Sequence, residues 1–242
     1  QGAAHAADGY SRATGKVGVC VATSGPGATN LVTGLATAFM DSIPLIAITG
    51  QVARPAIGRD AFQETDVLGV TQPITKHNFL VRNTDELAAI VHEAFRIARS
   101  GRPGPVLIDV PKDVQQLKTS YNPSAHMTSE EYLNAASADV PRPTAAALAQ
   151  AAQMIAQAER PLIMAGHGII LANAYAELQA FAEKTNIPVI TTLLGLSSFS
   201  ETHPLYLGMP GMHGPAHVNK AIGLSDLIIG VGLRFDDRVT GK

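Results

Sequence analysis

Short hydrophobic runs recur along the chain and are separated by longer segments with helical spacing of apolar residues. Runs of this length, in which polar and apolar residues do not alternate, are typical of strands that are buried on both faces. Such strands form parallel sheets covered by helices, so the pattern predicts an α/β fold. The six runs are VGVCVAT (17–23), IPLIAITG (43–50), PVLIDVP (105–111), PLIMAG (161–166), IPVITT (187–192) and DLIIGVG (226–232).

The alternation of strand and helix patterns is interrupted once, over residues 116–142. This segment is rich in Ser, Asn, Pro and Asp, which predicts a linker. We therefore expect a first domain at residues 1–115 and a second at residues 143–242. The second shows only three clear strand patterns, fewer than an open α/β sheet usually has.

The first helical pattern has Gly15 as a stop signal, but no capping residue precedes Gln1. We expect the chain to lack the start of the first domain and the end of the second.

Composition and charge narrow the class of ligand. The 242 residues include 18 basic and 20 acidic ones without a basic run, which argues against nucleic-acid binding and favours a small molecule. No apolar stretch reaches the roughly 18 residues of a membrane span. The one cysteine, Cys20, lies in an apolar run and is expected to be a small buried residue. This usage suggests the cytoplasm, or an organelle if a transit peptide has been removed.

Two stretches of the first half have the composition of a ligand site. In TSGPGATN (23–30), glycines between a strand and a helix let a ligand approach the backbone, although a tight turn alone would also require them. In AIGRDAFQETD (56–66), Gln63 can donate and accept hydrogen bonds beside Phe62, which can stack on a flat ring. A capped surface helix is the alternative for the second stretch.

The second half has a GxG turn of its own. Gly166 and Gly168 follow a strand, but Leu171 stands where a dinucleotide fingerprint has its third glycine. The turn still lets the backbone of a cofactor approach closely. The sequence therefore favours some nucleotide-like ligand over NAD.

A charged cluster, RFDDR (234–238), ends the last predicted strand. Two arginines around two aspartates can leave one guanidinium free to bind a carboxylate or phosphate with two hydrogen bonds, whereas solvated surface ion pairs are the simpler interpretation. His213 and His217 are separated by Pro215 and lack an acidic third ligand, so we expect no metal site there.

Six motifs together resemble one known family. In this order and at these separations, they resemble the catalytic subunits of acetohydroxyacid synthase (acetolactate synthase), and the resemblance covers essentially the whole chain. It implies a thiamine pyrimidine-binding domain followed by part of a central FAD-binding domain, with the activating glutamate immediately before Gln1. The motifs are TSGPGATN, DSIPLIAITGQV, AIGRDAFQETD, SGRPGPVLIDVPKDV, GMHG and RFDDRVTGK.

The resemblance also implies the chemistry. Thiamine diphosphate with Mg²⁺ would join pyruvate to a second 2-ketoacid, pyruvate or 2-ketobutyrate, with release of CO₂. The products, acetolactate or acetohydroxybutyrate, belong to valine, leucine and isoleucine biosynthesis, and FAD would be largely structural. Glyoxylate carboligase and pyruvate oxidase are rival enzymes of the same superfamily. A flavin- or nucleotide-binding module without chemistry is the alternative for this chain by itself, which we expect to be inactive alone.

The resemblance further implies partners and site residues. The protein would form a homodimer or homotetramer with its active site at the subunit interface, together with a small regulatory subunit. Pro26, Asn30 and Gln63 would face the thiamine. Catalysis would involve Gln63 together with Phe62 and Lys112, which border the substrate approach, and Arg238, which holds the carboxylate of the second ketoacid. No metal ligand is expected in this chain. The flavin-binding set would be Arg102, Gly166, His167, Gly168, Thr192, Leu193, Met212, His213, Gly214, Gly232, Leu233, Arg234 and Asp236.

Overall fold

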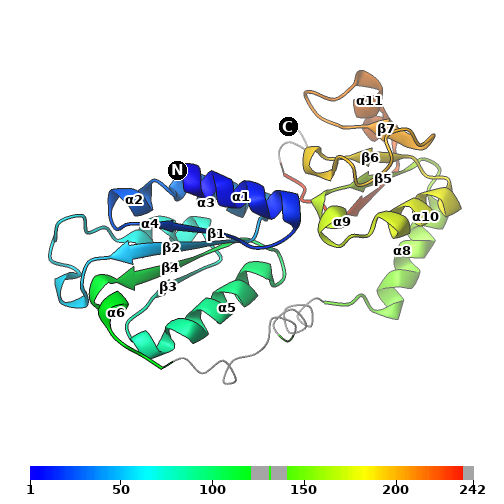
Figure 1. Cartoon of the computed structure of the whole chain (residues 1–242). Coiled ribbons are helices and arrows are strands. Elements are labelled where there is room, and N and C mark those ends of the chain that lie inside the picture. The colour runs from blue at the N-terminus through cyan, green and yellow to red at the C-terminus, as the bar shows by residue number, and fades with distance from the viewer. Residues whose placement is uncertain (121–130, 132–140, 237–242) are drawn as a thin grey trace. The chain divides into compact units, whose positions relative to one another are not determined.

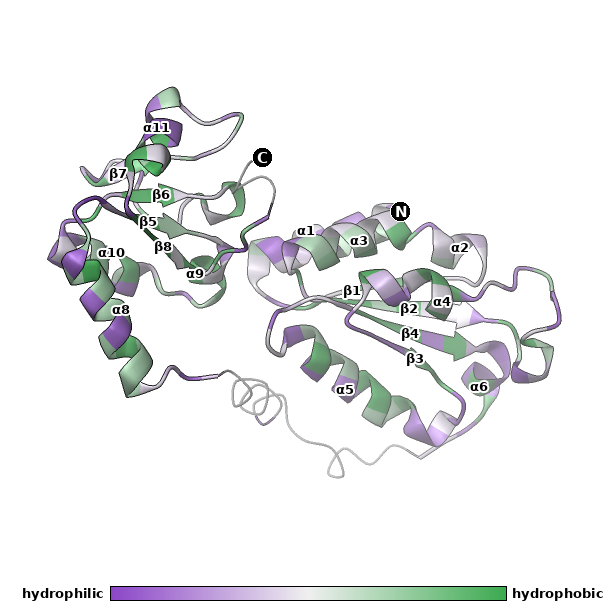
Figure 2. Cartoon of the chain, turned by 180° about the vertical axis from the view of Figure 1, so that it is seen from behind, coloured by the Kyte–Doolittle hydropathy of each residue, from purple (hydrophilic) through white to green (hydrophobic). Residues whose placement is uncertain are grey.

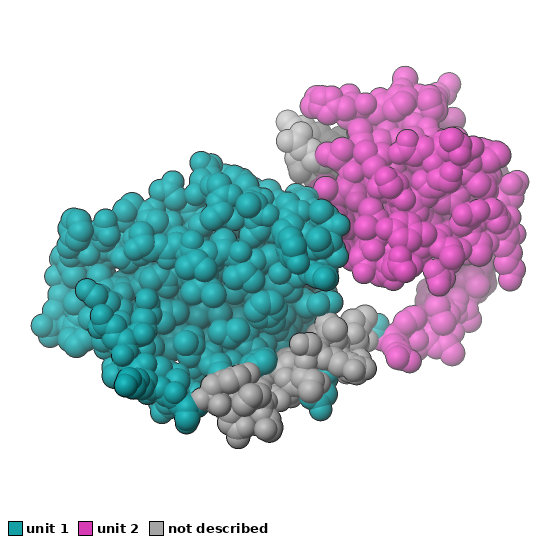
Figure 3. Space-filling model, in the orientation of Figure 1, with its two compact units in different colours: residues 1–141 teal, residues 142–242 magenta. Residues whose placement is uncertain are grey.

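The computed structural model describes residues 1–120, 131 and 141–236, and the chain divides into two compact units, residues 1–141 and 142–242 (Figures 1 and 3). Each unit contains a parallel sheet with helices packed on it, which confirms the predicted α/β class. The expected linker at residues 116–142 lies largely outside the described residues, and the domain boundaries predicted from it stay a prediction.

The sheet of the first unit has the strand order β1-β2-β4-β3, and each neighbouring pair is parallel. The strands predicted from apolar runs form β1, β2 and β4, and β4 is buried along its whole length. The fourth strand, β3, was not predicted because it is a short edge strand that includes polar residues. The bounds are β1 (Gly18–Ala22), β2 (Leu45–Gln51), β3 (His77–Leu80) and β4 (Pro105–Pro111).

Helices cover both faces of this sheet (Figure 1). On one face, residues of α1 (Gly2–Thr14), α2 (Pro26–Thr29), α3 (Val32–Asp41) and α4 (Val67–Thr71) join one hydrophobic core. On the other, α5 (Leu87–Arg99) and α6 (Lys112–Gln116) join a second core. The helix α1 ends at the predicted glycine, because Gly15 takes the left-handed conformation with φ of 68°. Short 3₁₀ helices occupy Arg54–Ala56, Gln72–Ile74 and Thr84–Glu86.

The sheet of the second unit has the order β7-β6-β5-β8, again with parallel pairs. Helices α9 and α10 pack on one face and α11 on the other, and β5 and β8 are strongly hydrophobic (Figure 2). The strands are β5 (Pro161–Ala165), β6 (Val189–Thr191), β7 (Tyr206–Gly208) and β8 (Leu227–Val231). The helices are α8 (Ala145–Gln157), α9 (His167–Leu171), α10 (Tyr175–Thr185) and α11 (Ala216–Leu224), with a 3₁₀ turn at Leu193–Gly195.

Two sequence expectations about the strands were wrong. The expected three strands of the second half become four among the described residues, because β7 is a three-residue edge strand without a recognisable apolar run. Burial on both faces also fails at the edge strands: in β1, Val19 is 46% exposed and Val21 67% exposed. An edge strand has a sheet neighbour on one side only, and in this case α5 packs mainly over β2, β3 and β4.

The connectivity of the second sheet creates a switch point. From β5 the chain proceeds outward to β6 and β7, then returns to the opposite side of β5 as β8. The connecting helices consequently lie on opposite faces of the sheet, on the two sides of this switch point. Ligands of open α/β sheets bind outside the carboxyl ends of the strands at such switch points.

Candidate functional site

The turn after β1 and the loop of residues 56–66 are packed against each other at the carboxyl edge of the first sheet. Gly25 has φ of 59°, and a Cβ on it would lie 2.6 Å from the Gln63 carbonyl oxygen. Gln63 itself has φ of 59°, which is unusual for a residue with a side chain. Pro26 follows as the first residue of α2. The structure thus brings Gln63 next to the glycine turn, and the assignment of Pro26, Asn30 and Gln63 to the thiamine stays a prediction.

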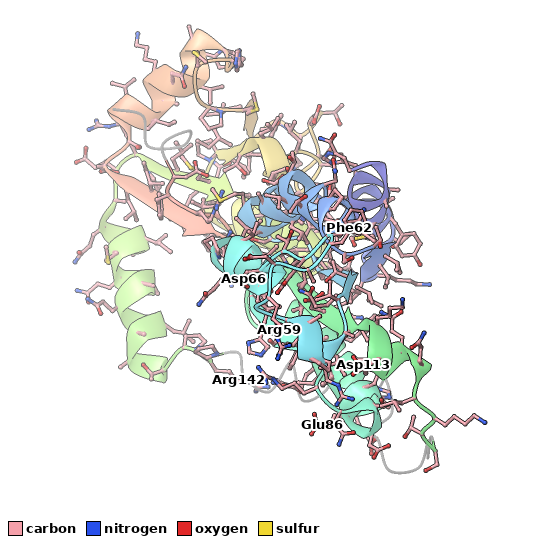
Figure 4. The ribbon with its side chains drawn as sticks, turned by 90° about the vertical axis from the view of Figure 1, so that its left-hand side faces the viewer. Arg59, Phe62, Asp66, Glu86, Asp113 and Arg142 are labelled. Atoms are coloured by element: carbon pink, nitrogen blue, oxygen red, sulfur yellow. The ribbon has the colours of Figure 1, made fainter. Side chains whose placement is uncertain are left out.

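A cleft of about 800 Å³ opens at the same edge of the sheet. It brings together Phe62 and Lys112, the two residues predicted to border the substrate approach. Figure 4 looks onto this edge and shows Phe62, whose residue surface is 89% exposed. Pro26, Asn30 and Gln63 do not line this cleft, and the amide of Asn30 donates to the Pro26 carbonyl (2.7 Å). Ser24, from the stretch TSGPGATN, also lines the cleft. Further lining residues that the sequence did not single out include Val21, Ile48, Gln51, Val91, Val110 and Gln115.

Glu64 braces the loop of residues 56–66 from within. Its carboxylate accepts the backbone N–H groups of Gly58, Arg59 (3.3 Å) and Ala61 (2.9 Å). These hydrogen bonds favour the ionised form and lower the pKa of Glu64, with the bonds from Gly58 and Ala61 contributing most. At the end of the loop, Asp66 caps α4 by accepting the Gly69 N–H (3.0 Å). The loop that carries Phe62 is therefore locally rigid.

A buried polar network lies between the carboxyl ends of β2 and β4. Asp109 is fully buried and accepts hydrogen bonds from the Thr49 hydroxyl (2.6 Å) and from the Gln51 amide (2.9 Å). Burial raises the pKa of Asp109 to about 6, the two hydrogen bonds oppose the rise, and the charge of Asp66 adds to it. The same Gln51 amide also donates to the Thr65 carbonyl (3.0 Å). The network thus connects the centre of the sheet to the loop.

An ion pair fixes the start of α6, where Lys112 stands. Arg54 Nε lies 2.7 Å from Asp113 Oδ2, and the Arg54 guanidinium also donates to the Arg82 carbonyl (2.7 Å). The Arg54 backbone N–H (3.0 Å) and then its guanidinium lower the pKa of Asp113. Figure 4 shows Asp113 on this side of the unit. These contacts hold the segment after β2 against the segment after β4.

Arg102 has a local partner set in the first unit. Its guanidinium donates to the Ser42 hydroxyl (2.8 Å) and to the carbonyls of Phe39 (2.9 Å) and Met40 (3.0 Å) at the end of α3. It also lies 5.7 Å from the centroid of the Phe39 ring. A cation at the carboxyl end of a helix is favourable for the helix dipole. The assignment of Arg102 to the flavin stays a prediction.

Glycine backbones pack closely on one another at the switch point of the second sheet. The Gly168 N–H donates to the Gly232 carbonyl (2.7 Å), and the Gly166 N–H donates to the Val231 carbonyl (2.9 Å). A Cβ on Gly168 would lie 2.6 Å from the Gly232 Cα, and one on Gly166 would lie 2.5 Å from the Gly232 oxygen. Three residues of the predicted flavin set therefore meet, and close packing of the main chain alone already requires them to be glycine.

The end of β6 reaches the same edge of the second sheet. The Thr192 N–H donates to the carbonyl of Ala165, the last residue of β5 (2.9 Å). Leu193, next along the chain, is 67% exposed. Thr192 and Leu193, both in the predicted flavin set, thus lie beside the GxG turn of residues 166–168, which contains His167. Exposed apolar side chains at a strand end are available to a ligand.

The other predicted flavin residues lie before α11 and after β8. Met212, 81% exposed, His213 and Gly214 form the turn before α11, where Gly214 packs directly on the Met209 carbonyl. After β8, Leu233 packs against Gly166, and Arg234 forms an ion pair with Asp236 (3.1 Å). Arg238 lies outside the described residues, so its carboxylate-binding role stays a prediction.

Metal-binding clusters and membrane-spanning helices are both missing from the part of the chain that the structure describes. Within residues 1–120, 131 and 141–236, no three His, Cys, Asp or Glu side chains gather in the way a metal site requires. Over the same ranges, the structure contains no helix with the length and apolar character needed to span a bilayer.

Comparison with known proteins decides the family. A family model described as "Thiamine pyrophosphate enzyme, N-terminal TPP binding domain" matches residues 1–70. A second model, described as "Thiamine pyrophosphate enzyme, central domain", matches residues 148–242. The chain belongs to the thiamine pyrophosphate enzyme family. The two family matches fall in different compact units, and the glycine turn and the loop with Gln63 both lie in the first match.

Curated relatives within the thiamine pyrophosphate enzyme family align over the whole chain. The chain is 55% identical to an acetolactate synthase of Arthrospira platensis and covers 42% of that protein. It is 55% identical to the acetolactate synthase large subunit of Parasynechococcus marenigrum and 52% identical to that of Corynebacterium glutamicum, of which it covers 39% and 38%. The chain thus spans about two fifths of the length of these relatives.

Proposed function

We propose that the protein to which this chain belongs is an acetolactate synthase, a thiamine-dependent transferase that joins pyruvate to pyruvate or 2-ketobutyrate with release of CO₂. The observation that carries the proposal is the cleft of the first unit, which joins the exposed ring of Phe62 to the cation of Lys112. A flat ring stacks on an aromatic side chain, and a ketoacid carboxylate pairs with a cation. Relatives of that name, 52% to 55% identical over the chain, support the same reaction.

Thiamine diphosphate would bind beside the turn after β1. The cofactor supplies the nucleophilic carbon that attacks the keto group. Gln63 would donate or accept hydrogen bonds at the edge of its ring system, and Pro26 and Asn30 would border it from α2. The absence of a Cβ at Gly25 lets the Gln63 backbone reach this turn, which fits a site built from both segments.

FAD would bind at the switch point of the second sheet. The switch point at the carboxyl ends of β5 and β8 is where open α/β sheets bind a nucleotide-like ligand, and the exposed Leu193 lies beside its GxG turn. The residues proposed to line it are those members of the flavin-binding set given above that lie in the second unit. Mg²⁺ would accompany the diphosphate of thiamine, and we propose no ligand for it from this chain.

The proposal extends to organisation and partners. Residues 1–115 would form the pyrimidine-binding domain and residues 143–242 the central FAD-binding domain. The protein would work in the cytoplasm or an organelle as a homodimer or homotetramer with the active site between subunits. Relatives named large subunits support a small regulatory partner.

The test is product formation by the full-length protein that carries this chain. With thiamine diphosphate, Mg²⁺ and FAD, we expect it to convert pyruvate into acetolactate, and into acetohydroxybutyrate when 2-ketobutyrate is added. Lys112→Gln should raise the KM for pyruvate about tenfold or more, because a charged hydrogen bond to the carboxylate is lost. Formation of tartronic semialdehyde from glyoxylate, or oxygen-dependent decarboxylation of pyruvate, would instead identify one of the rival enzymes.

A further inference from the structure

The amide of Gln51 connects two parts of the first unit that are distant in sequence. Gln51 ends β2, and its Nε2 lies 2.9 Å from Asp109 Oδ2 on β4 and 3.0 Å from the carbonyl oxygen of Thr65. Its Oε1 accepts the N–H of Val52 (2.8 Å). Both N–H groups and the oxygen of the amide are thus engaged, and one of these bonds reaches the loop that carries Phe62 and Gln63.

Asp109 determines which way the Gln51 amide faces. Its ionised carboxylate only accepts hydrogen bonds, so the NH₂ group of Gln51, and not its oxygen, must face it. The second carboxylate oxygen is engaged by the Thr49 hydroxyl (2.6 Å), and Asp109 is fully buried. A flipped amide would place an oxygen against both the Asp109 carboxylate and the Thr65 carbonyl. The second N–H of Gln51 is therefore directed at Thr65.

We propose that Gln51, oriented by Asp109, is a positioning residue that fixes the loop of residues 56–66 against the carboxyl edge of the first sheet. The inference deepens the proposed function, because this loop carries Phe62 and Gln63. The loop is located at two points: Gly25 limits the approach of Gln63 by direct contact, and Gln51 binds Thr65 two residues later.

The internal bonds of Glu64 determine what release at Thr65 would do. Because this carboxylate accepts N–H groups of Gly58, Arg59 and Ala61, the residues of segment 58–64 are coupled, so that the segment moves and opens as one unit. Loss of the Thr65 contact would then displace Phe62 and Gln63 together. This distinguishes Gln51 from a residue that merely supports the sheet.

Cleavage by trypsin after Arg59 measures the release of the loop without any cofactor or substrate. Arg59 is exposed and lies in the loop (Figure 4), and cleavage under native conditions reports the population of the opened segment. Gln51→Leu keeps the approximate volume and removes both donors. We expect cleavage after Arg59 to become about tenfold faster, the scale of one lost hydrogen bond, while cleavage after the exposed Lys118 keeps its rate.

Asn78→Leu is the matched control. Asn78, on β3, also donates from its amide to a backbone carbonyl, that of Leu68 in α4 (3.2 Å), and accepts from the Thr75 hydroxyl (2.8 Å). The variant Asn78→Leu loses a comparable pair of hydrogen bonds, but neither of them reaches the loop of residues 56–66. We expect its Arg59 cleavage to stay within about twofold of the unsubstituted chain. Equal acceleration in Gln51→Leu and Asn78→Leu would overturn the proposal.

A polarity swap separates positioning from support of the sheet. In the double variant Gln51→Glu with Asp109→Asn, the amide introduced on β4 can donate to the carboxylate introduced on β2, so the pair between the two strands is restored. The Thr65 carbonyl, however, then faces an acceptor. We expect the melting temperature to return to within a few degrees of the original while cleavage after Arg59 stays fast. Recovery of both the melting temperature and the slow cleavage after Arg59 would show that only the contact between β2 and β4 matters. This result would refute the positioning role of Gln51. This variant also serves if Gln51→Leu does not fold.

Turnover in the full-length protein provides the link to function. We expect Gln51→Leu to lower kcat for acetolactate formation about tenfold and Asn78→Leu to leave it unchanged, because only the first displaces Phe62 and Gln63. If the unsubstituted protein makes no acetolactate, the proposed function fails while the Arg59 cleavage still tests the loop attachment. Fast cleavage with unchanged kcat would show that the attachment exists but does not position the site.

Discussion

Gly25 and Gln63 meet through their backbones: a Cβ on Gly25 would lie 2.6 Å from the Gln63 carbonyl oxygen, and both residues have φ of 59°. Few residues with a side chain adopt either conformation. The two residues are also far apart in the sequence. The contact therefore fixes the distance between the turn after β1 and the loop of residues 56–66. Two segments proposed to hold the same cofactor are set against each other by the main chain alone.

Gly25→Ala should destabilise the chain by about 2–4 kcal/mol, because it combines a left-handed backbone with a direct clash against Gln63. Urea unfolding followed by circular dichroism measures this. Gly58→Ala is the matched control: Gly58 also has positive φ (80°), but a Cβ there meets nothing within 4 Å. It should cost only about 1 kcal/mol. Equal costs for the two variants would mean that the contact with Gln63 does not constrain the turn.

The stability contributed by Asp109 should fall as pH rises. Its pKa is raised to about 6 in the folded chain from an ordinary 3.8, so between these values the folded state binds the proton that the unfolded state has released. Stability is then lost as pH rises from about 4 to about 6, by about 3 kcal/mol in total.

Asp109→Asn removes this titration. The free energy of unfolding of the original chain, minus that of Asp109→Asn, should therefore be larger at pH 4 than at pH 7 by about 2–3 kcal/mol. Because both proteins contain the carboxylates whose pKa values are lowered, such as Glu64 and Asp113, the pH dependence that these groups contribute cancels in the difference. A difference that stays constant between the two pH values would contradict the raised pKa of Asp109 in the folded chain.

Gly168→Ala should distort the switch point of the second sheet. A Cβ would lie 2.6 Å from the Gly232 Cα, so the start of α9 and the segment after β8 must move apart, and we expect FAD affinity to fall at least tenfold in a fluorescence-quenching titration. Gly223→Ala in α11 meets nothing within 4 Å and should instead add up to about 1 kcal/mol of stability with FAD affinity unchanged. Unaltered flavin binding in Gly168→Ala would place the FAD site elsewhere.

Lys76→Met should weaken the end of α5. The Lys76 ammonium donates to the carbonyls of Ile97 and Ser100 (2.5 Å), which the helix itself leaves unpaired. Burial, and then the charge of Arg96, lower the pKa of Lys76. Loss of these bonds should cost about 1–3 kcal/mol in urea unfolding. Lys16→Met is the control at an exposed position outside the described helices, and it should change the free energy of unfolding by less than about 0.5 kcal/mol. A negligible effect at Lys76 would remove its capping role.

Much of the fold could be predicted from the sequence because buried parallel strands form uninterrupted apolar runs. The strands that escaped prediction, His77–Leu80 and Tyr206–Gly208, are short and lie at sheet edges, where tertiary pairing and not local sequence defines them. The resemblance pointed to Phe62 and Lys112 as residues that border the substrate approach, which stays a prediction, and in the structure both line one cleft. Local pattern alone could not bring them together, since they are 50 residues apart.

The network of Gln51 and Asp109 was missed although it left a signal. Asp109 is the only charged residue in the run PVLIDVP, and a lone carboxylate in a buried strand requires partners. Finding Thr49 and Gln51 as those partners requires the register between β2 and β4, in which Thr49 lies opposite Asp109. That register is a tertiary property.

The contact between Gly168 and Gly232 has a consequence for how much variation the second unit tolerates. Because main chain packs on main chain at this switch point, the spacing of the two segments does not depend on the side chains around it. The side chains of Leu193 and Met212, which are 67% and 81% exposed, contribute little to the core. Substitutions at these two positions should therefore cost the fold little, whereas neither glycine can take a side chain without moving the backbone.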